Sequence, residues 1–140
     1  MPSIVYSNVA QAGAQRKVRI DLPGREYEIL IGVGILNDAG RFIAQRLGAG
    51  LCGVVSDENV AGHHLKTLEA SMRAEGRFKG SVVLRPGEAT KRFGELERLS
   101  ESLLEMGLER GDLVVAFGGG VIGDLAAFAA SILRRGVRYV

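Results

Sequence analysis

A short glycine-rich motif is the part of this sequence best suited to chemistry. Residues 118–123 read GGGVIG and fit the pattern G-x-G-x-x-G, between an apolar run and a stretch with helical composition. Glycine suits a phosphate site at such a turn, because a Cβ would hold the phosphate away from the free N–H groups of the helix N-terminus. In this context the motif predicts phosphate binding, and a tight turn without a ligand is the alternative. It departs from the usual dinucleotide fingerprint, because it follows the third strand of the predicted strand–helix units rather than the first.

A carboxylate that could hold the ribose of a dinucleotide lies in an earlier segment. The usual fingerprint places an acidic residue about 20 positions after the glycines, which here falls beyond Val140. Asp57 follows an earlier apolar run and can accept hydrogen bonds from two hydroxyl groups. An N-cap of the helix expected near Val60 explains the same carboxylate equally well.

Charged side chains accompany two of the expected helix starts. Glu88 and Lys91 are three residues apart at one of them, where they can form an i,i+3 ion pair with or without a ligand. Asp124 directly follows the glycine motif. The helix dipole favours a carboxylate there, although that carboxylate would repel a neighbouring phosphate.

The elements that must position these residues follow from hydrophobic periodicity. Short apolar runs predict strands at residues 51–56, 81–84, 113–117 and 137–140. Apolar residues at helical spacing predict helices at about residues 35–47, 60–73, 91–106 and 121–134. Before them, alternating apolar residues over 17–22 and 27–31 predict a half-buried hairpin.

Strands that alternate with helices predict an α/β fold, doubly wound and Rossmann-like, with a mostly parallel sheet after the N-terminal hairpin. Ligands of such sheets bind beyond the carboxyl ends of the strands, where Asp57, Glu88 and the glycines stand. Residues 1–16 show no sustained period and are expected to be a leader, poorly ordered or at a sheet edge. Residues 17–140 are expected to form one domain, and the final apolar run suggests a piece of a longer protein.

Composition excludes several classes of function. The net charge of +2 comes from interspersed charges, so neither a nucleic acid nor a membrane is an expected partner. The sequence lacks a signal peptide and a membrane-spanning apolar run. The single cysteine, Cys52, excludes an internal disulfide and is expected in the core of a cytoplasmic protein. His63 and His64 are adjacent and diverge on a helix, so no metal site is expected.

Four motifs in this order and spacing resemble the N-terminal domain of the 3-dehydroquinate synthase family. They are DENV at 57–60, PGEATK at 86–91, GGGVIGD at 118–124 and Arg135-Gly136, and the resemblance covers about residues 17–140. It implies a cytoplasmic homodimer that binds NAD between this domain and a helical C-terminal domain holding a divalent metal, Zn or Co. It also implies a carbon–oxygen lyase of the shikimate pathway, which converts the sugar phosphate 3-deoxy-D-arabino-heptulosonate 7-phosphate to 3-dehydroquinate and phosphate.

The resemblance assigns roles to individual residues. Asp57 and Asn59 resemble adenosine-side contacts to NAD, and Glu88 and Lys91 the next contacts along the cofactor. The pyrophosphate and nicotinamide-ribose region is represented by Gly118, Gly119, Gly120, Val121 and Asp124. Arg135 resembles the arginine that reaches the substrate phosphate of the neighbouring subunit. The family's catalytic lysines and metal ligands correspond to sequence after Val140, so the chain alone is expected to hold no catalytic residue and to be inactive.

Two departures and three alternatives accompany this interpretation. Ala127 stands where many members have glycine, and Leu133 where an aromatic residue is common, so the packing of that helix is expected to differ. Another sugar-phosphate cyclase and a glycerol-dehydrogenase-like metal-dependent enzyme share the glycine turn. Asp124 favours 3-dehydroquinate synthase, because aminocyclitol-forming cyclases tend to have asparagine there. A non-catalytic nucleotide-binding module is the alternative from a different class.

Overall fold

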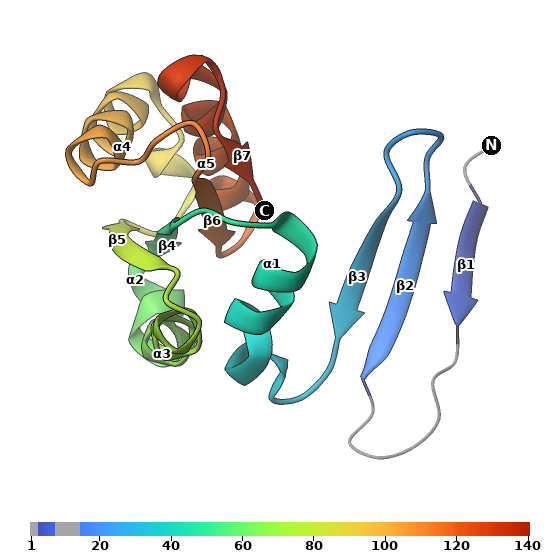
Figure 1. The fold of residues 1–140 in the computed structure, drawn as a ribbon. Helices are drawn as coiled ribbons and strands as arrows, with labels where there is room; N and C mark the ends of the chain where they lie inside the picture. Colours follow the sequence, from blue (N-terminus) through green and yellow to red (C-terminus); the bar gives the residue numbers. More distant parts are fainter. Residues whose placement is uncertain (1–2, 8–14) are drawn as a thin grey trace. The chain divides into compact units, whose positions relative to one another are not determined.

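The chain forms two compact units, Met1–Asp38 and Ala39–Val140. The computed structural model describes residues 3–7 and 15–140, with side chains from residue 15 onward (Figure 1). The expected division, a leader over residues 1–16 and one domain from residue 17, does not follow this boundary. The N-terminal strands form a sheet of their own, whereas the parallel sheet and its core lie in the second unit.

The first unit is an antiparallel sheet in the order β1-β2-β3, formed by β1 (Ser3–Ser7), β2 (Arg16–Asp21) and β3 (Tyr27–Ile31). The expected hairpin of β2 and β3 is confirmed, with its turn closed by the Arg25 N–H on the Leu22 carbonyl at 2.7 Å. The expectation of a half-buried β3 is wrong, because four of its five residues are exposed. A 3-10 turn, Ile35–Asp38, ends the unit.

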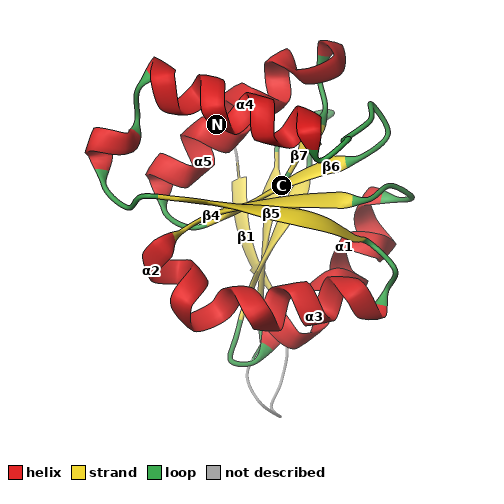
Figure 2. Cartoon of the chain, turned by 90° about the vertical axis from the view of Figure 1, so that its left-hand side faces the viewer, coloured by secondary structure: helices red, strands yellow, loops and turns green. Residues whose placement is uncertain are grey.

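The second unit alternates strands and helices around a parallel sheet. Its strands are β4 (Cys52–Asp57), β5 (Phe78–Leu84), β6 (Leu113–Phe117) and β7 (Arg138–Tyr139), in the order β5-β4-β6-β7. Its α-helices are α1 (Ala39–Leu47), α2 (Glu58–Val60), α3 (Lys66–Ala74), α4 (Phe93–Glu105) and α5 (Gly120–Ile132). Figure 2 shows α4 and α5 on one face of the sheet and α3 on the other. The doubly wound α/β fold expected from the sequence is therefore confirmed.

The main core lies between the sheet and the α4–α5 layer. Leu99 and Leu103 of α4 and Ala126 and Ala129 of α5 are fully buried against Val114 of β6. On the other face, α1 approaches α3 so closely that the Ser71 hydroxyl accepts the Gly40 N–H at 2.9 Å. This apolar packing holds the strand ends in place. No helix among the described residues has the length and apolar character needed to cross a membrane.

Two helix boundaries differ from the sequence expectation. The helix after β4 begins at Glu58 rather than near Val60 and passes through a π-helical turn, Ala61–Leu65, before α3. Helix α5 ends at Ile132, two residues before the expected end at 134, and Arg134 and Arg135 have positive φ angles of 49° and 67°. The chain leaves the helix early because it must turn back into β7.

Candidate functional site

The sheet reverses its direction of growth between β4 and β6. β4 pairs in parallel with β5 on one side and with β6 on the other. In doubly wound sheets this switch point is where ligands bind, beyond the carboxyl ends of the strands. The buried Ser56 hydroxyl donates to the Phe117 carbonyl at 2.7 Å and ties the two strand ends together. Asp57 and the glycine motif therefore start from neighbouring, fixed positions.

A cavity of about 280 Å³ opens at this switch point. Its lining comes from the segments that follow β4, β5 and β6, and comprises Asp57, Asn59, Val60, Arg85, Pro86, Gly87, Gly119, Gly120, Val121 and Ile122. The structure thus brings together residues from three motifs that lie far apart in the sequence. Five of the expected site residues line this one cavity: Asp57, Asn59, Gly119, Gly120 and Val121.

The Asp57 carboxylate caps the helix that follows β4. Its Oδ1 accepts the N–H groups of Asn59 at 2.9 Å and Val60 at 3.0 Å, and the residue is 9% exposed. Its Oδ2 lies toward Gly118, where a Cβ atom would stand 3.2 Å from it. One oxygen is used by the cap, so the other is the one that can accept a hydrogen bond from a ligand hydroxyl.

The three glycines of the turn differ in what would surround a side chain. A Cβ on Gly118 would come within 2.9 Å of Ile122 Cγ1, so internal packing requires glycine there. A Cβ on Gly119 or Gly120 would meet no atom within 4 Å beyond the adjoining residues and the backbone of its own helix. None of the three has a positive φ, and Gly119 supplies no side-chain cap to α5. Gly119 and Gly120 therefore leave open space beside the uncapped N-terminus of α5, where an anion is favoured.

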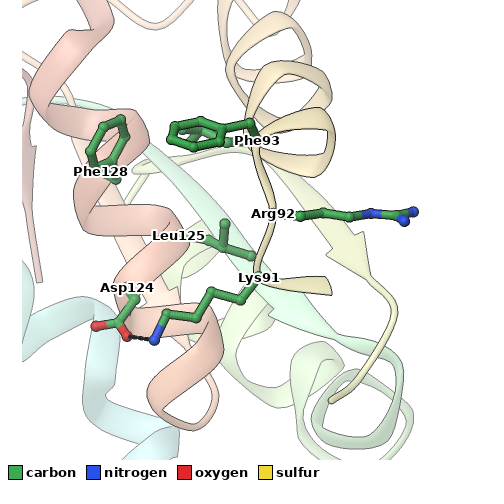
Figure 3. A pocket seen from close by; sticks show the side chains of 7 residues that line it. Lys91, Arg92, Phe93, Asp124, Leu125 and Phe128 are labelled. Atoms are coloured by element: carbon green, nitrogen blue, oxygen red, sulfur yellow. Dashed lines mark ion pairs between the residues drawn. The ribbon is translucent and has the colours of Figure 1, made fainter. Parts of the chain in front are cut away.

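Lys91 joins two acidic residues at the edge of the site. Its Nζ lies 3.6 Å from Glu88 Oε1, as the i,i+3 spacing predicted, and 2.6 Å from Asp124 Oδ2 on α5 (Figure 3). The hydrogen bond and the charge of Asp124, and then the charge of Glu88, raise the pKa of Lys91. Because Lys91 balances the charge of Asp124, the repulsion between Asp124 and a nearby phosphate is smaller than the sequence suggested.

A second cavity, of about 230 Å³, lies beside this ion pair between α4 and α5. Its wall is largely apolar, and Figure 3 shows Phe93 and Phe128 at the end away from Lys91 and Asp124. The two aromatic residues are 82% and 51% exposed. Lys91 and Asp124 therefore form the polar edge of this cavity, and the rest of its wall is largely apolar.

Other expected residues lie outside these cavities. Arg135 is exposed in the turn after α5 and lines neither of them, and Glu88 takes part only through Lys91. Burial raises the pKa of the Cys52 thiol, which is consistent with the core position expected for it. Among residues 15–140, no three His, Cys, Asp or Glu side chains gather as a metal site.

Three residues of the site were not predicted from the sequence: Ser56, Arg85 and Thr90. Arg85 lines the switch-point cavity directly after β5. Thr90 lies between Glu88 and Lys91, and its hydroxyl donates to the Arg85 carbonyl at 2.9 Å. The sequence does show that Ser56 is a polar residue inside an apolar run and that Thr90 is a hydroxyl residue inside a turn. Neither pattern specifies a hydrogen-bond partner.

Two solved structures share this fold. The crystal structure of 2-deoxy-scyllo-inosose synthase matches with a TM-score of 0.75 at 21% identity, over 88% of this chain and 34% of that one. The structure of 2-epi-5-epi-valiolone synthase from Streptomyces hygroscopicus, with NAD+ and Zn2+ bound, matches with a TM-score of 0.58 at 25% identity, over 69% and 27%. The protein is thus of the class of doubly wound α/β domains that carry a cavity at the sheet's switch point.

Sequence comparisons narrow this class to one family. Residues 81–140 match the family model described as 3-dehydroquinate synthase N-terminal. The chain is 53% identical over 123 residues to 3-dehydroquinate synthase of Roseobacter denitrificans, and 48% identical over 132 residues to that of Rhizobium rhizogenes. These matches cover 88% and 94% of this chain, but only 33% and 35% of the relatives. The chain belongs to the 3-dehydroquinate synthase family and spans about a third of the length of these relatives.

Proposed function

We propose that this chain is the NAD-binding part of a 3-dehydroquinate synthase. The observation that carries the proposal is the meeting of Asp57 with Gly119 and Gly120 at one cavity, located at the switch point of the sheet. The relatives named 3-dehydroquinate synthase support the same conclusion, because they are 53% and 48% identical to this chain over most of its length.

The residues present fit a dinucleotide. The open space at Gly119 and Gly120 would admit the pyrophosphate, and the first N–H groups of α5 would donate to it. The oxygen of Asp57 that the cap leaves free would accept a ribose hydroxyl, with Asn59 beside it. Lys91, held between Glu88 and Asp124, would supply the nearby positive charge on the nicotinamide side.

The proposed reaction is the conversion of 3-deoxy-D-arabino-heptulosonate 7-phosphate to 3-dehydroquinate and phosphate. When it is bound, NAD would accept a hydride and later return it, and is therefore regenerated within one turnover. The task of this chain is to bind and orient that cofactor. The chain spans about a third of the relatives' length, and the divalent metal, Zn or Co, would be held by the remainder.

The partners form the finer part of the proposal. Arg135 would bind the substrate phosphate of a neighbouring subunit in a homodimer, because a guanidinium group can grip a phosphate through paired hydrogen bonds. Its exposed position in a turn outside both cavities is compatible with a ligand held elsewhere. A cytoplasmic location belongs to the same proposal, in keeping with a single buried and unpaired cysteine.

Isothermal titration calorimetry of the chain with NAD tests this function. We expect saturable binding by the chain and no phosphate release from the heptulosonate phosphate above the rate without protein, even with NAD and a divalent metal added. Absence of NAD binding by the folded chain would refute the proposed role in cofactor binding. Phosphate release by the chain alone would show that the chemistry does not require residues outside it.

A non-catalytic nucleotide-binding module is the second candidate function. The exposed aromatic residues Phe93 and Phe128 beside the Lys91–Asp124 pair argue against it, because a self-sufficient binding module has little use for exposed aromatic side chains next to its site. Comparing ADP with NAD separates the two. A module specialised for adenylate would bind both equally, whereas contacts at Lys91 and Asp124 require the nicotinamide half of the cofactor.

A further inference from the structure

The loop that carries Glu88 and Lys91 has a single buried residue. From Arg85 to Gly94 every residue is exposed except Thr90, which is 6% exposed. An exposed loop without regular strand or long-helix hydrogen bonds pays a large entropy cost to hold one conformation. Something must therefore anchor this stretch if Lys91 is to meet Asp124 on another element.

Thr90 is placed to be that anchor. Its hydroxyl donates to the carbonyl of Arg85 at 2.9 Å and so closes the loop across its base. Its backbone N–H donates to the Gly87 carbonyl at 3.1 Å, and its own carbonyl accepts the N–H of Arg92 at 2.8 Å. The side chain and both backbone groups of Thr90 thus define the path of the chain on either side of Lys91.

The lysine depends on this path. The Lys91 side chain is 43% exposed and has many rotamers, so its 2.6 Å contact with Asp124 requires its Cα to be correctly placed. Lys91 directly follows the segment that the Thr90 hydroxyl closes, and its N–H donates to the Glu88 carbonyl within that segment at 2.9 Å. Loss of the hydroxyl would free the base of the loop while leaving α5 and Asp124 unchanged.

We propose that Thr90 is a positioning residue for NAD binding, which acts through Lys91 by closing the 85–90 loop with its hydroxyl group. The proposal rests on the proposed function, because it takes Lys91 to be a contact of NAD. Its first step, the placement of Lys91 against Asp124, holds without any ligand and can be measured separately.

The test uses Thr90→Val, which removes the hydroxyl and keeps the shape, and Thr90→Ser, which keeps the hydroxyl. Ser71→Ala is the matched control, because Ser71 is also buried, at 8% exposure, and its hydroxyl also bonds the backbone at 2.9 Å, but away from the site. Two quantities are measured for each: the pKa of Lys91 by NMR in the free chain, and the dissociation constant for NAD by calorimetry.

We expect Thr90→Val to lower the pKa of Lys91 and to weaken NAD binding about fivefold, the effect of one lost hydrogen bond. Thr90→Ser should restore both quantities, and Ser71→Ala should lower only the melting temperature. In a Lys91→Gln background, Thr90→Val should add nothing to the loss of NAD affinity, because the two changes act through the same contact.

Several results would overturn the inference. An unchanged Lys91 pKa in folded Thr90→Val would show that the hydroxyl does not place the lysine. Additive losses of NAD affinity in the double variant would show that Thr90 acts by another route. A wild-type chain that binds no NAD would instead refute the proposed function, while a lowered Lys91 pKa in Thr90→Val would still support the positioning step.

Discussion

The ammonium group of Lys91 lies 2.6 Å from the Asp124 carboxylate, which links the loop after β5 to the first half of α5. Both residues line the cavity between α4 and α5, beside the candidate NAD site. Their contact also joins two segments that are distant in the sequence, and the sequence alone did not predict that Lys91 and Asp124 would be partners. Both side chains are largely exposed, so this contact matters more for geometry than for stability.

Replacement of Asp124 by Asn should lower the pKa of Lys91, because Asp124 is its largest favourable partner. Glu88→Gln should lower that pKa less, since Glu88 lies farther away at 3.6 Å. A pKa raised in the folded state stabilises the fold at any pH below that of an unfolded lysine, and the effect is lost as pH rises through the folded value. NMR titration of Lys91 measures the shift, and an equal or larger effect of Glu88→Gln would contradict this ranking.

Asp57→Asn should separate the cap from the cofactor contact. Asparagine caps a helix about as well as aspartate, so we expect the melting temperature to stay nearly constant. Loss of the negative charge should weaken NAD binding about tenfold, because a charged acceptor hydrogen-bonds a hydroxyl more strongly than an amide does. Asp57→Ala should lose both properties, with a cost of about 1 kcal/mol in stability. An Asn variant that binds NAD like the wild type would leave Asp57 with the capping role alone.

Substitutions at the three glycines of the turn should have two different effects, one on stability and one on NAD binding. Gly118→Ala should destabilise the protein by about 1–3 kcal/mol, because its Cβ would collide with Ile122. Gly119→Val or Gly120→Val should instead abolish NAD binding in a folded chain, because the side chain would fill the space for the pyrophosphate. Calorimetry with NAD, alongside circular dichroism of each variant, distinguishes these outcomes. Unchanged NAD affinity in folded Gly119→Val would make the turn purely structural.

Gly123→Ala is the matched control within the same motif. Gly123 lies inside α5 and lines neither cavity, and a Cβ added to it would meet no atom within 4 Å beyond the adjoining residues and the backbone of its own helix. Alanine costs less backbone entropy than glycine in a helix, so this change should stabilise the chain by about 0.5–1 kcal/mol. Thermal denaturation measures the gain, and NAD affinity should stay constant. A loss of NAD binding here would mean that the whole motif, rather than Gly119 and Gly120, contacts the cofactor.

Arg135→Ala tests the proposed contact with a partner's substrate. In a complete enzyme containing this chain, kcat/KM should fall at least about tenfold, with NAD affinity and melting temperature nearly unaltered. Arg134→Ala is the control, because Arg134 reaches the Leu108 carbonyl and Glu109 within this chain. Mixing Arg135→Ala with a variant defective only in its metal site should restore some activity in heterodimers. A variant that loses stability but keeps its substrate kinetics would make Arg135 a structural residue.

Much of the second unit could be predicted from local pattern. The strand at 113–117 was predicted at its observed bounds, and the runs around 51–56 and 81–84 each fell within a residue or a few of β4 and β5. These segments are buried and apolar, and helices of 3.6-residue period separate them, so periodicity alone identifies them. The glycine motif was predictable for the same reason, since its turn lies between two such segments.

The contacts that make a site were decided by the tertiary structure. The order β5-β4-β6-β7 places Asp57 beside the glycine turn, and this order depends on which strands pair rather than on any local period. The Lys91–Asp124 contact and the early end of α5 at Ile132 likewise depend on how α4, α5 and β7 pack. Residue type and spacing therefore determined which groups this protein offers for chemistry. Only long-range strand pairing and helix packing decided which of those groups meet, because a local sequence pattern contains no information about partners distant in the chain.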